Sequence, residues 1–180
     1  MGLFIAFIMV FSIFGFVINF AIQPSVSTAK YGDFKFRVVN QQYITKINGD
    51  EYKFVFFPMD LEYIMLSDEV KQLLAQPVLT VTYDPKSNLS QNLGEAQYYM
   101  ELQLSDEIMI ERALIDNAGT SLPQKSCADA TSSQPVIDLR ISGVSGIRTE
   151  DSCIIVTALD AHDLYQQVER IVYTVLGVMS

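Results

Sequence analysis

The sequence predicts an α/β protein with one N-terminal transmembrane helix, followed by a single domain with a mixed, partly parallel sheet flanked by helices. Three observations support this prediction. Residues 3–22 are apolar apart from Ser12, Gly15 and Asn19. Segments rich in aromatic and β-branched residues then alternate with segments of helical periodicity. Residues 31–180 are sufficient in number to form one domain with its own hydrophobic core.

The anchor is expected at residues 3–22, since no Asp, Glu, Lys or Arg precedes Lys30. A helix of this length covers the roughly 30 Å hydrocarbon core of a bilayer. The run is longer than the apolar region of a signal peptide and lacks a basic start, which favours an uncleaved anchor. Ser27-Thr28-Ala29 leaves cleavage before Lys30 open. Residues 23–30 are predicted to be a linker, and residues 31–180 the soluble domain.

Four phenylalanines are predicted to lie on one face of the anchor helix. Their spacings of three, four and three residues form a seam that would pack against a partner helix in the membrane, and Gly15 beside it allows close approach. The alternative is a chance pattern in a Phe-rich run. The predicted partners are therefore the lipid bilayer and a protein in or at the membrane. The seam consists of Phe4, Phe7, Phe11 and Phe14.

Two features give opposite indications for the side of the membrane. Lys30, Lys35 and Arg37 follow the anchor closely, and the positive-inside tendency alone would place the domain in the cytoplasm. Cys127 precedes one predicted strand and Cys153 begins another, so neighbouring strands would bring the sulfurs together in a disulfide. Two buried free thiols are the alternative. Because long domains cross membranes largely regardless of flanking charge, we expect an extracytoplasmic domain on the cell membrane.

The domain is expected to open with an antiparallel hairpin whose turn is Asn48-Gly49. In the strand that follows, Tyr52, Phe54 and Phe56 are expected to face the core and Phe57 the opposite side. A strand–helix–strand–helix–strand order over residues 51–115 predicts right-handed crossovers and parallel pairing. Predicted strands cover 34–39, 43–47, 51–57, 78–83, 108–115, 136–141 and 153–158; predicted helices begin near 68, 88 and 160, and residues 116–133 form a loop.

Four aspartates follow predicted strands and are the candidate metal ligands. In parallel sheets, ligands bind beyond the carboxyl ends of the strands, where these carboxylates would converge. Hard oxygen ligands suit Mg²⁺ or Ca²⁺. The alternative is that they serve as helix caps and turn residues. The four are Asp60, Asp84, Asp116 and Asp160.

Other catalytic signatures are weak, and no catalytic residue is assigned. His162 lies between two aspartates, and Ser145 is the one suggestive serine, but Gly-Val-Ser-Gly lacks the nucleophile-elbow pattern. No glycine-rich phosphate loop is present. A formal net charge of −9 argues against a nucleic-acid partner, while one histidine and two cysteines exclude zinc-ribbon sites.

Several segments of the last third resemble those of small membrane-anchored proteins of archaea. They are Cys127 with Ala128 and Thr131, Pro135-Val136-Ile137, Cys153-Ile154-Ile155, and Arg170-Ile171-Val172-Tyr173 before Leu176-Gly177-Val178. The resemblance implies an anchor followed by an exported domain with paired cysteines, and it implies no activity.

These observations favour a non-enzymatic, membrane-anchored interaction or envelope protein. A metal-dependent hydrolase using the four aspartates is the alternative from the enzyme class. A filament subunit is a third hypothesis, suggested by the apolar N-terminal helix, although the cleavage motif of pilins is absent.

Overall fold

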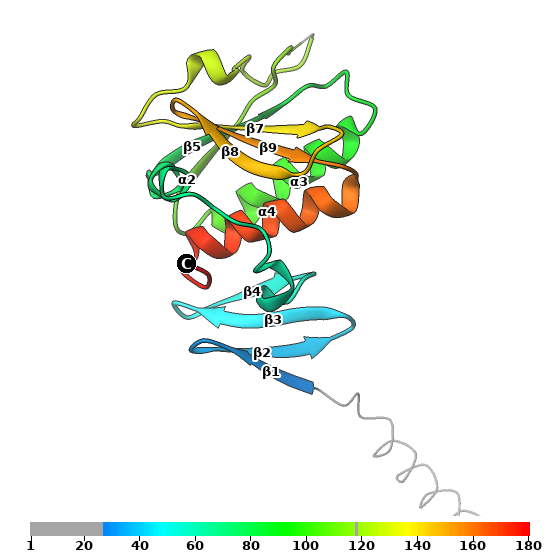
Figure 1. The fold of residues 1–180 in the computed structure, drawn as a ribbon, viewed down its shortest axis with the longest axis vertical. Helices are drawn as coiled ribbons and strands as arrows, with labels where there is room; N and C mark the ends of the chain where they lie inside the picture. Colours follow the sequence, from blue (N-terminus) through cyan, green and yellow to red (C-terminus); the bar gives the residue numbers. More distant parts are fainter. Residues whose placement is uncertain (1–26, 118) are drawn as a thin grey trace, which may run out of the picture.

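The computed structural model describes residues 27–117 and 119–180, which form two sheets with strand orders β1-β2-β3-β4 and β6-β5-β7-β9-β8 (Figure 1). The expectation of an α/β fold with a mixed, partly parallel sheet and flanking helices is confirmed. The anchor segment 3–22, with Phe4, Phe7, Phe11 and Phe14, lies outside the described residues. Within the described ranges, no helix has the length and apolar character needed to cross a bilayer.

The N-terminal sheet is an antiparallel meander of β1 (Ser27–Tyr31), β2 (Phe34–Val39), β3 (Gln42–Ile47) and β4 (Asp50–Phe54). Asn48 and Gly49 both have positive φ at the β3–β4 turn, as predicted for a tight hairpin. The predicted linker 23–30 was too long, because Ser27–Lys30 already pairs with β2. Ser27 and Ala29 carry little strand propensity, and pairing with β2 makes this segment a strand.

The second sheet has four parallel strands, β5 (Val78–Tyr83), β6 (Met109–Arg112), β7 (Val136–Ile141) and β9 (Cys153–Ala158). The edge strand β8 (Gly146–Glu150) runs antiparallel to β9 and was not predicted. The predicted hairpin of 43–47 with 51–57 is confirmed, but the expectation that residues 51–57 also belong to the mixed sheet was wrong, since β4 lies in the separate meander.

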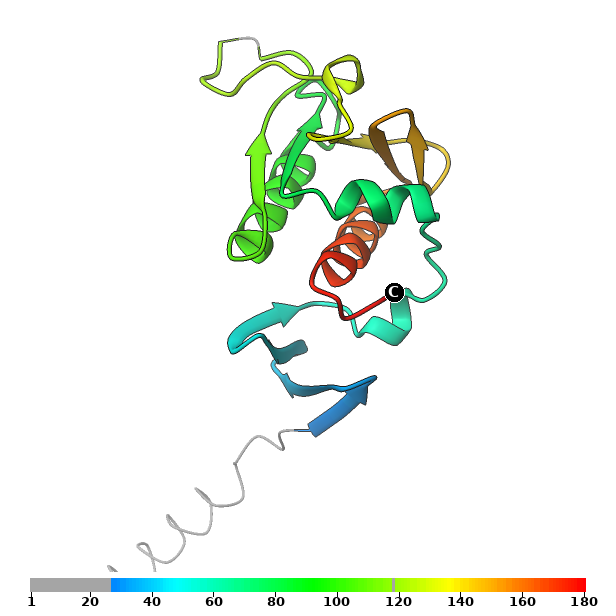
Figure 2. The same ribbon diagram turned by 90° about the vertical axis from the view of Figure 1, so that its left-hand side faces the viewer.

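Three helices, α2 (Asp68–Leu74), α3 (Ser90–Leu104) and α4 (Ala161–Val175), pack on one side of the mixed sheet (Figures 1 and 2). Their caps follow the sequence: the Ser67 side chain accepts a hydrogen bond from the Val70 amide, and that of Asp160 from the Asp163 amide. The loop that contains the 3₁₀ helix η2 (Cys127–Asp129) lies against the opposite face.

One continuous hydrophobic core joins the meander to the helical layer. The Tyr173 ring in α4 stacks on Phe54 of β4 with centroids 4.0 Å apart, and meets Phe36 of β2 edge-on at 6.3 Å. The Tyr173 hydroxyl donates a hydrogen bond to the Phe56 carbonyl oxygen at 2.9 Å. The two sheets are therefore parts of a single folded unit.

The aromatic residues at the end of the meander only partly follow the predicted alternation. Tyr52 and Phe54 are buried, as expected for the core face. Phe57 was expected on the opposite face, yet its ring meets Phe36 edge-on at 5.3 Å. The strand ends at Phe54, before the 3₁₀ helix η1 (Pro58–Leu61), so the two-residue period no longer governs Phe57.

Candidate interaction surface

Cys127 and Cys153 form an intramolecular disulfide, which confirms the predicted pairing. Their Cα atoms lie 5.2 Å apart, and the bridge closes a loop with a sequence separation of 26. Cys153 begins β9, while Cys127 begins η2 on the face of the sheet opposite the helices. The bond therefore ties the long polar loop to the sheet.

A charged pair that the sequence analysis missed lies beside the disulfide. Asp138 in β7 is buried, and its Oδ2 accepts hydrogen bonds from Arg140 Nε at 2.9 Å and Nη2 at 2.6 Å. The Oδ1 atom has no hydrogen-bond partner among the described residues. Burial raises the pKa of the Asp138 carboxyl, and the hydrogen bonds from Arg140 oppose that shift. The signal was present, because an Asp-Leu-Arg triplet places both charges on one face of a strand.

The four candidate aspartates are not assembled into a metal site. Asp84 and Asp116 follow β5 and β6, but Lys86 engages both: its amide donates to Asp84 at 2.9 Å, and its ammonium pairs with Asp116. Asp160 caps α4, and Asp60 lies in η1 after a strand of the other sheet. In the part of the chain that the structure describes, no group of three His, Cys, Asp or Glu residues could hold a metal ion.

His162 and Ser145 are likewise engaged in separate local contacts. The imidazole ring meets Phe56 edge-on with centroids 5.1 Å apart. The Ser145 hydroxyl donates a hydrogen bond to Asp163 at 2.9 Å and accepts one from Gln167 at 2.7 Å. These contacts attach the β7–β8 loop to α4, and they do not make a nucleophile–base pair.

A crevice of about 410 Å³ lies where the strand order reverses, between the carboxyl ends of β5 and β7. Such switch points are the usual ligand sites of open α/β sheets. Two of its polar groups are already occupied, since Arg140 binds Asp138 and Asp84 accepts from the Lys86 amide. Its lining residues are Asp84, Ser87, Leu93, Ile115, Leu139, Arg140 and Ile141.

The outer face of the meander is the most distinctive surface of the domain. Strand register places Thr28 opposite Arg37, Lys30 opposite Lys35, and Lys46 opposite Glu51, with Ile44 between Arg37 and Lys53. Because side chains alternate along a strand, every basic residue of the meander falls on this one face, and all are exposed. We call these five residues the basic face: Lys30, Lys35, Arg37, Lys46 and Lys53.

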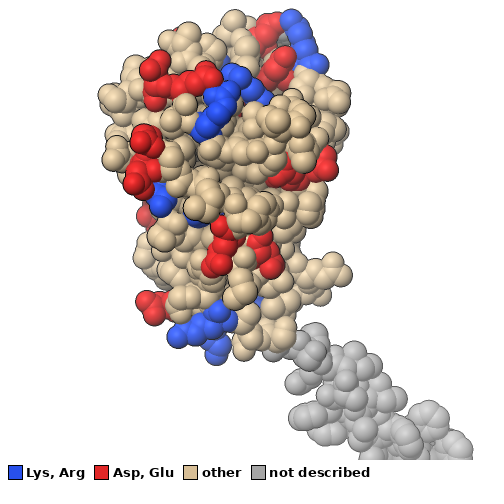
Figure 3. Space-filling model, viewed as in Figure 1, with Lys and Arg blue, Asp and Glu red and all other residues tan. Residues whose placement is uncertain are grey.

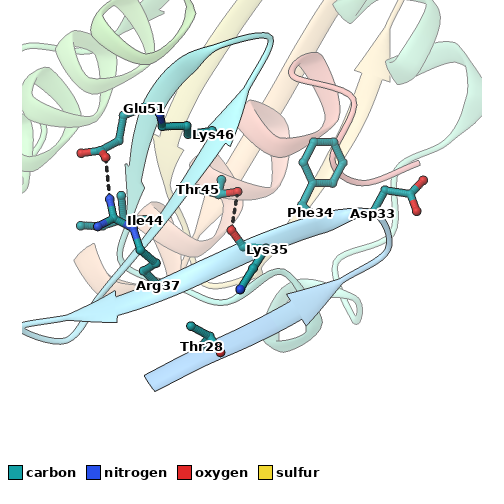
Figure 4. A pocket seen from close by; sticks show the side chains of 9 residues that line it. All are labelled: Thr28, Asp33, Phe34, Lys35, Arg37, Ile44, Thr45, Lys46 and Glu51. Carbon is teal, nitrogen blue, oxygen red and sulfur yellow. Dashed lines mark hydrogen bonds and ion pairs between the residues drawn. The ribbon is translucent and has the colours of Figure 1, made fainter. Parts of the chain in front are cut away.

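The basic face is hollowed, with a cavity of about 760 Å³ (Figure 4). Arg37 Nη2 forms an ion pair with Glu51 Oε2 at 2.7 Å, and both side chains remain about half exposed. The Thr45 hydroxyl donates to the Lys35 carbonyl oxygen at 3.1 Å, which fixes β3 against β2. Ile44 forms an apolar floor between the charged side chains, with only 9% of its surface exposed. The lysines thus project from a rigid sheet.

Charge is unevenly distributed between the meander and the rest of the chain. Residues 27–54 hold five basic and three acidic side chains, a net charge of +2. The remaining seven basic and eighteen acidic side chains give the rest of the protein −11. Figure 3 shows one group of basic side chains at the meander end, while the basic side chains toward the opposite end are interspersed with acidic ones. The total charge of −9 does not indicate this segregation, which appears only when the charges are assigned to the two parts of the fold.

Comparison of the chain with protein-family models, with curated proteins and with solved structures gave no match.

Proposed function

We propose that this chain is a membrane-anchored, extracytoplasmic interaction protein with no catalytic role. In this proposal residues 3–22 are the anchor, and the folded unit that starts at β1 is displayed on the oxidising side of the cell membrane. The anchor helix contacts the lipid bilayer, and its Phe seam contacts a protein partner inside the bilayer.

The Cys127–Cys153 disulfide is the observation that carries the proposal. Structural disulfides persist mainly in exported domains, because the reducing systems of the cytosol keep cysteine thiols reduced. The apolar run ends at Ile22 and β1 begins at Ser27, so the connection spans at most about 17 Å. The domain would therefore stay close to the bilayer surface.

A cluster of exposed apolar side chains supports a protein partner for the displayed domain. Met59, Tyr63 and Met65 belong to one short segment and are 59%, 61% and 78% exposed. Methionine-rich exposed surfaces adapt readily to partners, since the side chain is flexible and polarisable. This segment is the expected contact for a protein at the membrane.

The test is the location of the full chain in cells. With a C-terminal tag, the protein should remain in the membrane fraction after alkaline carbonate extraction, and protease added to intact cells should remove the tag. A non-reducing intact mass should show the loss of two hydrogens and an uncleaved N-terminus. A soluble chain, or a tag protected from protease on intact cells, would contradict the proposal.

Neither alternative function gains support from the described residues. The metal-dependent hydrolase needs converging carboxylates, whereas Asp84 and Asp116 are held by Lys86 and Asp160 caps a helix. The filament hypothesis depends on residues 3–22, which lie outside the described ranges.

A further inference from the structure

We propose that the basic face of the meander binds the anionic headgroups of the same bilayer that holds the anchor. This inference rests on the proposed membrane anchoring. It adds a second membrane contact, which sets the orientation of the domain.

The geometry provides a multivalent cationic platform. All four meander strands contribute: Lys30 from β1, Lys35 and Arg37 from β2, Lys46 from β3 and Lys53 from β4. Neighbouring strands lie about 4.8 Å apart, so the charges are spread over an area that several headgroups occupy. Two acidic residues line the cavity on this face: Glu51, which is in register with Lys46 and is paired with Arg37, and Asp33 in the β1–β2 turn.

Proximity favours the bilayer over a soluble anion as the occupant. The short connection from Ile22 to Ser27 keeps β1 within about 17 Å of the end of the apolar run. Contact with headgroups is then an intramolecular event, which needs little intrinsic affinity. Each Lys or Arg near an anionic membrane surface adds to the attraction, which fades over a Debye length of about 8 Å.

The charge distribution also fixes which side of the domain meets the membrane. The meander carries +2 and the rest of the chain −11, so an anionic surface attracts the first and repels the second. Attraction and repulsion act together to turn the basic face toward the lipid. The Met59–Tyr63–Met65 segment and the crevice at β5 and β7 lie outside this face, so they stay available to other partners.

Lysine footprinting of the reconstituted full chain tests this inference. The protein is inserted into vesicles of phosphatidylcholine alone, or of phosphatidylcholine with 30 mol% phosphatidylglycerol, and treated with a membrane-impermeant amine-reactive ester. Mass spectrometry reads the modification of each lysine. We expect Lys30, Lys35, Lys46 and Lys53 to be modified several-fold less in the anionic vesicles. About 0.5 M salt should abolish this difference, because it screens the attraction between the lysines and the headgroups.

Internal controls separate the possible outcomes. Lys71 in α2 and Lys125 in the polar loop should react equally in both vesicles. The variant Lys35→Glu/Lys46→Glu should lose the protection of Lys30 and Lys53, whereas the matched charge reversal Lys71→Glu should retain it.

Two results would overturn the inference. One is equal modification of the basic face in both vesicle types. The other is protection that is present in both and insensitive to salt, which would indicate a protein occupant such as a second copy. Failure of the chain to float with any vesicle would instead refute the anchoring on which the inference depends, so the two failures are distinguishable.

Discussion

The Glu169 carboxylate in α4 accepts a hydrogen bond from the Val55 backbone amide at 2.8 Å, across the boundary between the helical layer and the meander. Its second oxygen accepts from the Phe56 amide at 2.9 Å, and the Tyr99 hydroxyl of α3 donates to the first at 3.0 Å. These two amides would otherwise continue the β4 ladder. The buried carboxylate therefore ends the strand and holds the two layers together.

Stability is predicted to depend on pH through Glu169. Burial raises the pKa of this carboxyl to about 7, against the three hydrogen bonds that lower it. Between pH 4.5 and 7 the folded state thus holds a proton that the unfolded chain has released. The contribution of Glu169 to the free energy of unfolding is fully present below about pH 4.5. On the order of 3 kcal/mol of it is lost as the pH rises from 4.5 through 7. Urea unfolding across this range measures it.

The variant Glu169→Gln isolates this effect from the other carboxyls. At pH 4.5 the folded wild type carries a neutral carboxyl, in which both oxygens can accept hydrogen bonds, whereas the NH₂ group of Gln cannot accept, so we expect a loss of about 1 to 3 kcal/mol. That loss should shrink as the pH approaches 7, because only the wild type is destabilised by ionisation. A difference that is constant between pH 4.5 and 7 would contradict the assigned pKa.

Removal of Arg140 is predicted to cost more stability than removal of its ion-pair partner Asp138. Removing the cation in Arg140→Ala leaves the buried carboxylate unpaired and should cost about 3 kcal/mol at pH 7. Asp138→Asn should cost less, because Arg140 is 43% exposed and water replaces its partner. The cost of Arg140→Ala should fall at pH 5, where the Asp138 carboxyl protonates more readily. Equal costs for the two variants at pH 7 would argue against this account.

Loss of the disulfide is predicted to destabilise the domain without abolishing its fold. The double variant Cys127→Ser/Cys153→Ser should lose about 3.5 kcal/mol, the chain-entropy value for a loop with this separation of 26. The core formed by both layers does not include the bridge, so circular dichroism should retain helix and strand signals. Unfolding of the variant under native conditions would show that the bridge is essential.

Gly94 in α3 is predicted to be coupled to Tyr83 at the end of β5. A Cβ added at position 94 would lie 2.8 Å from the Tyr83 hydroxyl oxygen, closer than real contacts allow. Gly94→Ala should therefore gain little in the wild type, but should stabilise the Tyr83→Phe background by about 1 kcal/mol, the helix-propensity difference. A double-mutant cycle by urea unfolding measures the coupling, and additive effects would contradict it.

Sequence patterns predict the structure of single elements correctly where local chemistry decides it. The Asn48-Gly49 turn, the Ser67 and Asp160 caps, and the strands at 34–39, 78–83, 136–141 and 153–158 all appear as predicted. Turn and cap preferences arise from a residue's own backbone and its nearest amides. Apolar or alternating runs of six residues bounded by turn signals predict strands because their side chains suit a sheet with both faces or one face buried.

Errors arose where a distant residue decides the structure. The predicted strand 51–57 ends at Phe54 because Glu169, more than one hundred residues away, takes the next two amides. Strands β1 and β8 have weak patterns of their own and exist because a partner strand pairs with them. The aspartates were grouped by their place after strands, but β4 belongs to another sheet, which moves Asp60 away from the strand ends of the mixed sheet.

The α/β class and most of the helices and strands follow from the amino-acid sequence, because propensities and caps act locally. Two cysteines allow only one intramolecular disulfide, and the structure shows that it forms rather than leaving two free thiols. The division into two sheets, their connection through Glu169, and the gathering of five scattered cations on one face depend on long-range contacts. Register and layer packing are sums of weak long-range contacts, and no short window of residues contains them.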